Sequence, residues 1–241
     1  MMDPSPMPQQ LAYIPLEPVP MPRPVDRIDY IVSRCAGKRV VDLGCYDETA
    51  LVKRDTDTWL HGRIAAVAAD VVGIDNSAGI PAEGLRTGPH SVIMPGDASS
   101  PEQALRSGTF EVAVAGELIE HLPDALGFLK KVKTSFAGRQ LILTTPNATS
   151  VSNAILGLAS RESNHKDHLQ IFSYKTLHTL CLRAGFEDWT IVPYHVHFSE
   201  MILNAKGASQ LFVKGAERIV NTWETLFPMQ AGGLILDVAR V

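Results

Sequence analysis

Seven short apolar segments constrain the fold of this chain more than any other feature. Five of them are five to seven residues long, are rich in valine and isoleucine, and lie at residues 39–43, 70–75, 91–97, 110–116 and 140–146. Because these segments lack polar alternation, we expect strands that are covered on both faces, as in a parallel sheet. Two further segments, 188–196 and 232–241, are predicted to be closing strands.

Helical patterns separate these strands, over residues 57–69, 122–136 and 172–186. The first two place their apolar side chains at helical intervals. In the third, Ser173 is a predicted N-cap and Gly185 a predicted terminator. Ser100 and Gln103 predict a capping box for a shorter helix. The alternation of strands and helices predicts a doubly wound α/β domain with right-handed crossovers.

The chain is expected to divide into an arm and a single domain. Residues 1–24 contain eight of the sixteen prolines, and proline excludes both a helix and a central strand. We expect an extended arm; a second interpretation lays its apolar side chains over the mouth of a ligand site or on a partner subunit. Residues 25–241 are predicted to form one domain. The apolar side chains of the arm are Leu11, Tyr13, Ile14 and Leu16.

A helical insertion is predicted at about residues 197–230, between the last two strands. Its apolar side chains are available for a lid or a core, and insertions at this place shape ligand pockets. An oligomer interface or simple packing is an equally open interpretation, and a homodimer is therefore compatible with the sequence. The side chains in question are Leu211, Val213, Ile219 and Trp223.

The composition limits the class of protein. The net charge is −4 with no long run of either sign, which disfavours a dedicated nucleic-acid surface. The three cysteines are scattered, so reduced thiols are expected and a disulfide framework or a zinc site is not. No apolar stretch is long enough to span a membrane, and no signal-peptide pattern opens the chain. We expect a cytoplasmic protein without a membrane partner.

Polar residues stand where the predicted strands end. Ligands bind at the carboxyl ends of such strands, so these residues are candidates for one site. A carboxylate at the end of the second strand, Asp75, suits a ribose diol. Each residue also has a structural interpretation, since aspartate commonly caps turns and helices. The residues are Asp42 and Gly44, Asp75, Asp97 and Ala98, Glu117 with Glu120 and His121, and Asn147.

The motifs VVDLGC, VVGIDNS, MPGDAS, AGELIEHL and LILTTPN strongly resemble the class I S-adenosylmethionine-dependent methyltransferases, closest to the type 11 and type 23 branches. The resemblance implies a Rossmann-like, seven-stranded sheet whose last strand is antiparallel, in a single methyltransferase domain. It implies S-adenosylmethionine as the cofactor. It places Asp42, Gly44 and Cys45 by the methionine half, Asp75 with Asn76 at the ribose, Asp97 and Ala98 at the adenine, and Glu117 near the substrate.

The loop after the first strand departs from the family pattern, because Tyr46 and Glu48 stand where further glycines are usual. Such glycines let the backbone adopt positive φ and approach the cofactor. S-adenosylmethionine has no pyrophosphate, so its loop need not cradle an anion on bare amides. Cofactor binding is therefore expected to survive, with the turn made at Gly44 or Cys45. The missing GxGxxG disfavours a nicotinamide dehydrogenase.

The methyl acceptor is predicted to be an oxygen of a small molecule or of a sugar. His121 is the first candidate for the base, because the ordinary pKa of histidine lies near neutral. His168 belongs to a second polar cluster with His165 and Asp167, and Glu117 completes the candidate catalytic set. The expected partner is a small-molecule acceptor, and nucleic acid is disfavoured.

Two alternatives remain open. Glu117, Glu120, His121 and His168 resemble the metal-binding residues of small-RNA 3′-terminal 2′-O-methyltransferases, whose set would suit Mn²⁺ or Mg²⁺. We do not favour the metal, because the same GE-x-x-EH pattern occurs in small-molecule members of the fold. The second alternative is a non-catalytic protein of methyltransferase fold, motivated by Tyr46 and Glu48.

Overall fold

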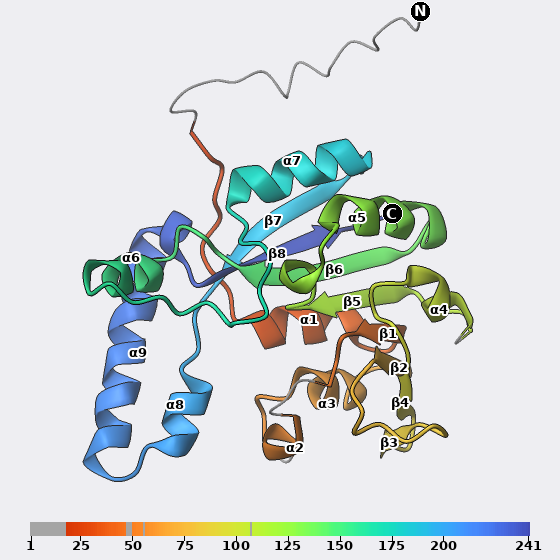
Figure 1. Ribbon diagram of the computed structural model, residues 1–241, viewed down its shortest axis with the longest axis horizontal. Helices are drawn as coiled ribbons and strands as arrows, with labels where there is room; N and C mark the ends of the chain where they lie inside the picture. Colours follow the sequence, from red (N-terminus) through yellow and green to blue (C-terminus); the bar gives the residue numbers. More distant parts are fainter. Residues whose placement is uncertain (1–17, 47–49, 55, 107) are drawn as a thin grey trace, which may run out of the picture.

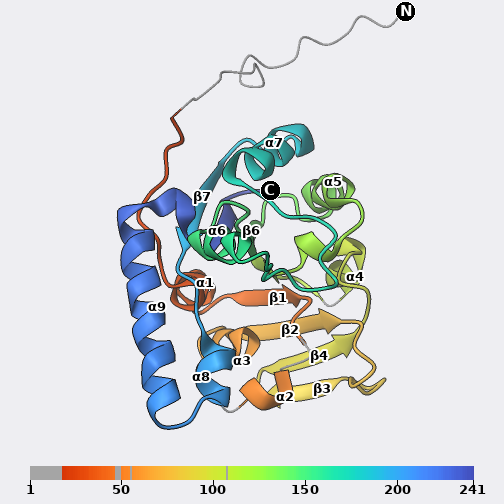
Figure 2. The same cartoon turned by 60° about the vertical axis from the view of Figure 1, so that its left-hand side comes forward.

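The computed structural model describes residues 18–46, 50–54, 56–106 and 108–241 (Figure 1). Residues 1–17 and Glu48 lie outside this range, and with them the apolar side chains of the proline-rich arm. The described part forms one sheet with helices on both faces (Figures 1 and 2). No helix within it is long and apolar enough to cross a membrane.

The sheet has eight strands in the order β3-β4-β2-β1-β5-β6-β8-β7. Strands β1, β2, β4, β5 and β6 are parallel, and β8 lies antiparallel between β6 and β7. Their bounds are β1 Arg39–Leu43, β2 Asp70–Asp75, β3 Leu85–Gly88, β4 Ser91–Pro95, β5 Val112–Gly116, β6 Gln140–Pro146, β7 Trp189–Tyr194 and β8 Gly233–Val238.

The predicted doubly wound α/β class with an antiparallel last strand is confirmed, and all seven predicted strands are present. The predicted number of strands is corrected from seven to eight. The additional strand, β3, pairs antiparallel with β4 at the edge of the sheet, with an irregular register between Arg86 and Gly88. Its sequence, LRTG, holds one apolar residue and no strand pattern, which is why the sequence did not predict it.

Helices cover the two faces of the sheet. Helices α4, α5 and α7 lie on one face and α1 and α3 on the other (Figure 1). Helices α6, α8 and α9 lie on the side toward which the parallel strands point. The bounds are α1 Arg27–Cys35, α2 Ala50–Lys53, α3 Leu60–Ala65, α4 Pro101–Arg106, α5 Ala125–Ser135, α6 Val151–Leu158, α7 Tyr174–Ala184, α8 Ser199–Asn204 and α9 Ala208–Leu226, with short 3₁₀ turns η2 Ile119–His121 and η3 Pro228–Gln230.

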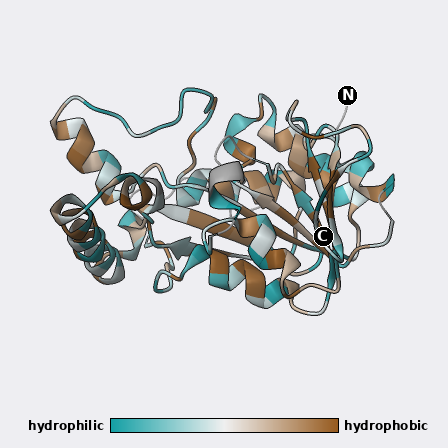
Figure 3. Ribbon diagram, turned by 90° about the horizontal axis from the view of Figure 1, so that it is seen from below, coloured by the Kyte–Doolittle hydropathy of each residue, from teal (hydrophilic) through white to brown (hydrophobic). Residues whose placement is uncertain are grey.

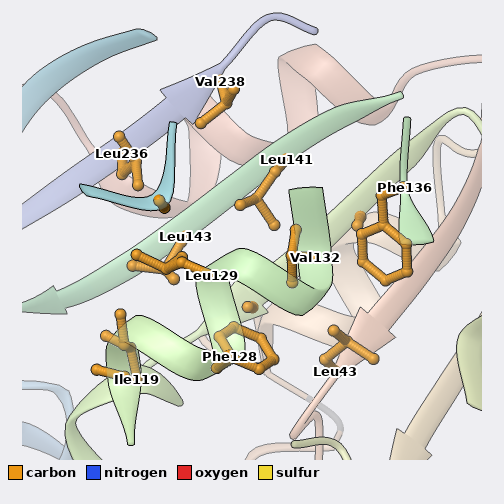
Figure 4. Close-up of a cluster of buried hydrophobic side chains, with 14 of the residues drawn as sticks. Leu43, Ile119, Phe128, Leu129, Val132, Phe136, Leu141, Leu143, Leu236 and Val238 are labelled. Atoms are coloured by element: carbon orange, nitrogen blue, oxygen red, sulfur yellow. The ribbon is translucent and has the colours of Figure 1, made fainter. Parts of the chain in front are cut away.

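The larger core lies between the sheet and helices α5 and α7 (Figure 4). Phe128, Leu129 and Val132 of α5 pack on Leu141 and on neighbouring strand residues, all of them buried. Hydrophobic stretches run along the central strands when the ribbon is coloured by hydropathy (Figure 3). This core holds the strands rigidly, so the residues at their carboxyl ends have fixed positions.

Local signals set the ends of the helices. The predicted cap of α7 is confirmed: Ser173 and Thr176 form a capping box, and Gly185 ends the helix at φ 83°. Gln103, predicted to form a capping box with Ser100, has its Oε1 on the amide of Asp97 instead (2.9 Å). The side chain therefore ties α4 to the end of β4.

Candidate active site

A cavity of about 850 Å³ opens at the carboxyl ends of β1, β2, β4 and β5. Its volume is in the range of sites for small ligands and cofactors, roughly 300–1,000 Å³. All eight predicted cofactor-binding residues line it, together with His121 and His168; the eight are Asp42, Gly44, Cys45, Asp75, Asn76, Asp97, Ala98 and Glu117. Residues from four strand ends are thus brought together in one cavity.

The turn after β1 is made at Gly44. Its φ is 70°, in the region that favours glycine, and its amide donates to the carbonyl of Ile74 (2.9 Å). A Cβ at this position would lie 3.1 Å from Leu118 Cδ1. Two residues further along, the amide of Tyr46 donates to Asp75 Oδ2 (2.9 Å). The described part of the turn thus uses one glycine, and the carboxylate that ends β2 fixes it at Tyr46.

Asp75 ends β2 and is 8 % exposed. Its Oδ2 accepts from Tyr46 and its Oδ1 accepts from the amide of Ser77 (2.9 Å). The carboxylate therefore fixes the loop after β1 and the turn after β2, and it lines the cavity at the end of β2.

Asp97 follows β4 and is engaged locally. Its Oδ1 accepts from the amide and the hydroxyl of Ser99 (2.9 and 2.6 Å), and its Oδ2 accepts from the hydroxyl of Ser100 (2.8 Å). These bonds, with Ser99 the strongest, hold the pKa of the Asp97 carboxyl below its ordinary value. Asp97 thus shapes the turn into α4, and the small, buried Ala98 beside it leaves room in the cavity.

Asp42 is held by a residue that the sequence did not predict. His61 of α3 is 1 % exposed; its Nδ1 lies 2.9 Å from Asp42 Oδ2, and its Nε2 lies 3.0 Å from the Ser91 hydroxyl. Gly73 of β2 makes room, since a Cβ there would lie 2.5 Å from Cys45 Sγ and 3.0 Å from His61 Cε1. The one sequence feature that could have indicated this contact is that His61, a polar residue, is adjacent to Leu60 on the inward side of the predicted helix.

Glu117 directly follows β5 in a strained conformation, with φ 54° for a residue other than glycine. Its Oε1 accepts from Thr144 Oγ1 (2.9 Å) and from the Tyr194 hydroxyl (2.8 Å), and Arg27 Nη1 lies 3.4 Å away. Burial, and next the charge of Glu117, raise the pKa of the Tyr194 phenol well above its ordinary value. Tyr194 therefore stays a donor, and three groups from distant parts of the chain fix one carboxylate.

Three histidines meet at the rim of the cavity. The ring centres of His121 and His168 are 4.7 Å apart, and that of His165 lies 6.3 and 5.8 Å from them. His121 Nδ1 lies 3.2 Å from the carbonyl oxygen of Asp167. Burial, and next the proximity of His121, lower the pKa of His168. The segment is held in place because the amides of Leu169 and Gln170 donate to the carbonyl of Glu120.

Glu120 is fully buried, and neither of its carboxylate oxygens has a hydrogen-bonding partner among the described residues. Burial, and next the charge of Glu117, raise its pKa to about 8. One ligand atom from each of Glu120, His121 and His168 lies within 4.8 Å of the others, and His168 Nδ1 is likewise buried and unpartnered in the described part. Glu117 is not a member of this group, so three of the four residues of the alternative metal set come together.

A second cavity of about 630 Å³ adjoins the first. The two cavities share five lining residues, which form the boundary between them: Arg27, Lys53, Thr58, Glu117 and His168. Polar side chains from β7, α6 and the segment before α1 line the second cavity, and Met201 of α8 lies at its wall. The molecule thus offers two ligand spaces that meet at Glu117 and His168.

The fold and the cavity together define a class I methyltransferase. A family model described as a methyltransferase domain, type 23, matches residues 3–191, and the chain belongs to this family. The family implies S-adenosylmethionine as the methyl donor. No curated protein matches the sequence.

Solved structures of methyltransferases share the fold at low sequence identity. The small RNA methyltransferase HEN1 superposes with a TM-score of 0.54 at 17 % identity, over 89 % of this chain and 25 % of that one, so this chain spans about a quarter of its length. An S-adenosylmethionine-dependent methyltransferase from Mesorhizobium loti superposes with a TM-score of 0.51 at 15 % identity, over 88 % of this chain and 95 % of that one. The methyltransferase domain of bacterial CtHen1 superposes with a TM-score of 0.50 at 15 % identity, over 90 % of this chain and 98 % of that one.

Proposed function

We propose that the protein transfers a methyl group from S-adenosylmethionine to an oxygen of a small polar molecule, such as a sugar hydroxyl. The observation that carries this proposal is the pair of adjoining cavities. One contains the residues expected to hold the cofactor, the other is lined by polar groups, and both reach Glu117 and His168. Methyl transfer requires this arrangement, since its catalysis depends largely on proximity and alignment.

The residues of the first cavity fit S-adenosylmethionine. Asp75 lines the cavity at the end of β2, where a carboxylate suits a ribose diol, and its oxygens accept from the amides of Tyr46 and Ser77. Ala98 lets a flat base lie against the chain, and Asp97 is the candidate acceptor for its amino group. Gly44 brings the backbone close at the methionine half. When bound, this cofactor supplies an electrophilic methyl group on a sulfonium.

His121 is the proposed base for the acceptor hydroxyl. Its Nδ1 faces the Asp167 carbonyl, and a carbonyl can only accept, so the proton of the neutral ring resides on Nδ1. Nε2 then carries the lone pair and can take a proton from the acceptor. Glu117, fixed by Thr144, Tyr194 and Arg27, keeps its carboxylate at the boundary of the two cavities.

Titration calorimetry of the purified protein with S-adenosylhomocysteine tests the cofactor assignment. We expect micromolar binding that EDTA does not change. A screen of hydroxylated small molecules with radiolabelled S-adenosylmethionine then tests the acceptor class. Absence of binding under every condition would contradict the proposal and favour the non-catalytic alternative.

A second candidate function has its own observation, the unpartnered carboxylate of Glu120 beside His121 and His168. Two imidazoles and a carboxylate fit Mn²⁺ or a similar ion, and these three residues would hold it. The ion would lower the pKa of acceptor hydroxyls, as expected for an RNA 3′-terminal 2′-O-methyltransferase. The name of the HEN1 structure, a small RNA methyltransferase, supports this candidate in fold only.

The two candidates assign different roles to one side chain, since His121 is a base in the first and a ligand in the second. Calorimetric titration with Mn²⁺, in the wild type and in Glu120→Gln, separates them. A Mn²⁺ isotherm that Glu120→Gln abolishes, together with Mn²⁺-dependent methylation of a short RNA, would put the second candidate first.

A further inference from the structure

Helix α9 presents an apolar face to solvent. Its only buried residue among those described is Glu224, and it lies at the outer edge of the molecule beyond α8 in two views (Figures 1 and 2). The core position considered for Leu211, Ile219 and Trp223 is not what the structure shows, because these side chains are exposed. The exposed fractions range from 44 to 77 % for Leu211, Phe212, Ile219, Trp223, Leu226 and Phe227.

These side chains form one stripe. At 3.6 residues per turn, Phe212, Ile219, Trp223 and Leu226 fall within a narrow sector of the helix, with Leu211 and Phe227 at its margins. The opposite side of α9 faces the body of the molecule. Glu224 there accepts from the amide of Val196 and pairs with His195. The apolar stripe therefore lies on a side of α9 that does not contact the domain through Glu224.

The stripe is symmetric about Ile219. Gly215 and Trp223 stand four residues to either side of it, Phe212 and Leu226 seven, and the two marginal residues eight. In an antiparallel pair of such helices crossing at Ile219, residue 219 meets its own copy. Trp223 then faces Gly215 of the partner subunit, a large side chain opposite the smallest one. An isologous twofold interface requires this kind of self-complementarity.

The surface has the shape that such a pairing needs. An open hollow of about 440 Å³ is lined by Gly215, Ile219, Trp223 and their neighbours. Trp223 is held in position by a hydrogen bond from Nε1 to Gln230 Oε1 (2.6 Å) and by its contact with Phe227, 4.5 Å between ring centres. A fixed aromatic side chain beside a hollow is typical of the energetic centre of an interface.

The exposed area is also of the right size. The three aromatic rings of the stripe alone expose on the order of 300 Å², which is already the size of the largest apolar patch on a typical monomer, roughly 300–600 Å². Leu211, Leu226 and Ile219 about double this exposed apolar area. Leu158 of the neighbouring helix α6 adds to it, since its side chain is 91 % exposed. The total approaches the ~800 Å² per partner of a standard interface.

We propose that this face is covered by a second copy of the chain, in a twofold dimer whose two α9 helices run antiparallel and cross at Ile219. The proposal does not depend on the methyl transfer proposed above.

Gly215→Leu is the sharpest test, because a Cβ at this position meets no described atom within 4 Å and its φ lies outside the positive region. Leucine also favours the helix more than glycine does, so the fold is expected to be retained or stabilised. In the dimer the added side chain displaces Trp223 of the partner subunit. We expect the dimer dissociation constant, measured by sedimentation equilibrium of the full chain, to rise about tenfold or more. Lys214→Leu is the matched control, because Lys214 lies outside the stripe, and this substitution should leave the dimer dissociation constant unchanged.

Cysteine cross-linking tests the register independently. Ile219→Cys is expected to form a disulfide-linked dimer on mild oxidation, because residue 219 lies on the twofold axis, whereas Lys214→Cys should stay monomeric in the same gel. A wild-type chain that sediments as a monomer at every concentration and does not cross-link at 219 would overturn the proposal. Flotation of that monomer with vesicles of phosphatidylglycerol and phosphatidylcholine, lost in Ile219→Asp, would assign the face to a lipid surface instead.

Discussion

Asp75→Asn is the most informative perturbation of the proposed cofactor site. The wild-type carboxylate binds two loop amides and is expected to accept from two ribose hydroxyls. A hydrogen bond to a charged group contributes about 1.5–3 kcal/mol. Asparagine loses one acceptor atom and weakens the remaining bond by removing the charge, for a total of about 3 kcal/mol. We therefore expect the dissociation constant for S-adenosylhomocysteine to rise about 100-fold.

Calorimetric titration measures this change directly. Asp70→Asn is the matched control, because Asp70 is the exposed first residue of the same strand, at the opposite edge of the sheet. Thermal unfolding of both variants shows whether the loop anchor or the whole fold is affected. Binding by a folded Asp75→Asn within about threefold of the wild type, less than 1 kcal/mol, would refute the assignment and leave Asp75 a loop anchor only.

Three further outcomes are expected. His121→Ala should leave S-adenosylhomocysteine binding unchanged and slow transfer roughly 10²–10⁴-fold in single-turnover assays; an unchanged rate excludes it as the base. Asp42→Ala should lower the free energy of unfolding in urea by about 3 kcal/mol, because it leaves His61 buried without its partner, and His61→Leu in the same chain should recover part of the loss. Asp26→Asn removes an ion pair with His197 (3.0 Å), which lowers the pKa of Asp26 to about 2 and raises that of His197. The pair is partly exposed, so the loss is about 1 kcal/mol at most. This loss of unfolding free energy should be largest near pH 5 to 6. It should fade as pH rises through the raised pKa of His197, where the imidazole loses its charge, and as pH falls from about 4 to about 2, where Asp26 becomes protonated. A loss independent of pH in urea titrations would show that the charges contribute nothing.

The site could be predicted from the sequence to the extent that it consists of strand ends. Asp75, Asp97 and Glu117 each follow a recognisable strand, and parallel strands bring their carboxyl ends to one edge. The position of the last helical insertion was also readable from its sequence. These inferences need only local patterns and the order of the strands.

Pairings between distant residues could not be predicted. His61 reaches Asp42 because α3 packs over Gly73, and Glu117 is fixed by Arg27 of α1 and Tyr194 of β7, which are far apart in the sequence. The stripe on α9 illustrates the same limit, since a helical pattern shows that one face is apolar but not whether that face meets the domain or another molecule. Such facts follow from packing and are absent from any short window of sequence.

The place of β8 in the sheet has a consequence for biosynthesis. Among the described strands, β7 (Trp189–Tyr194) bonds to the sheet only through β8 (Gly233–Val238), which inserts between it and β6. A nascent chain that has emerged through β7 therefore leaves the edges of β6 and β7 unpaired while the α8–α9 excursion is translated. At about 5–20 residues per second, this interval lasts on the order of seconds. During it, the β8-facing edges of β6 and β7 and the apolar stripe of α9 are exposed together, and open strand edges of this kind pair readily with another chain.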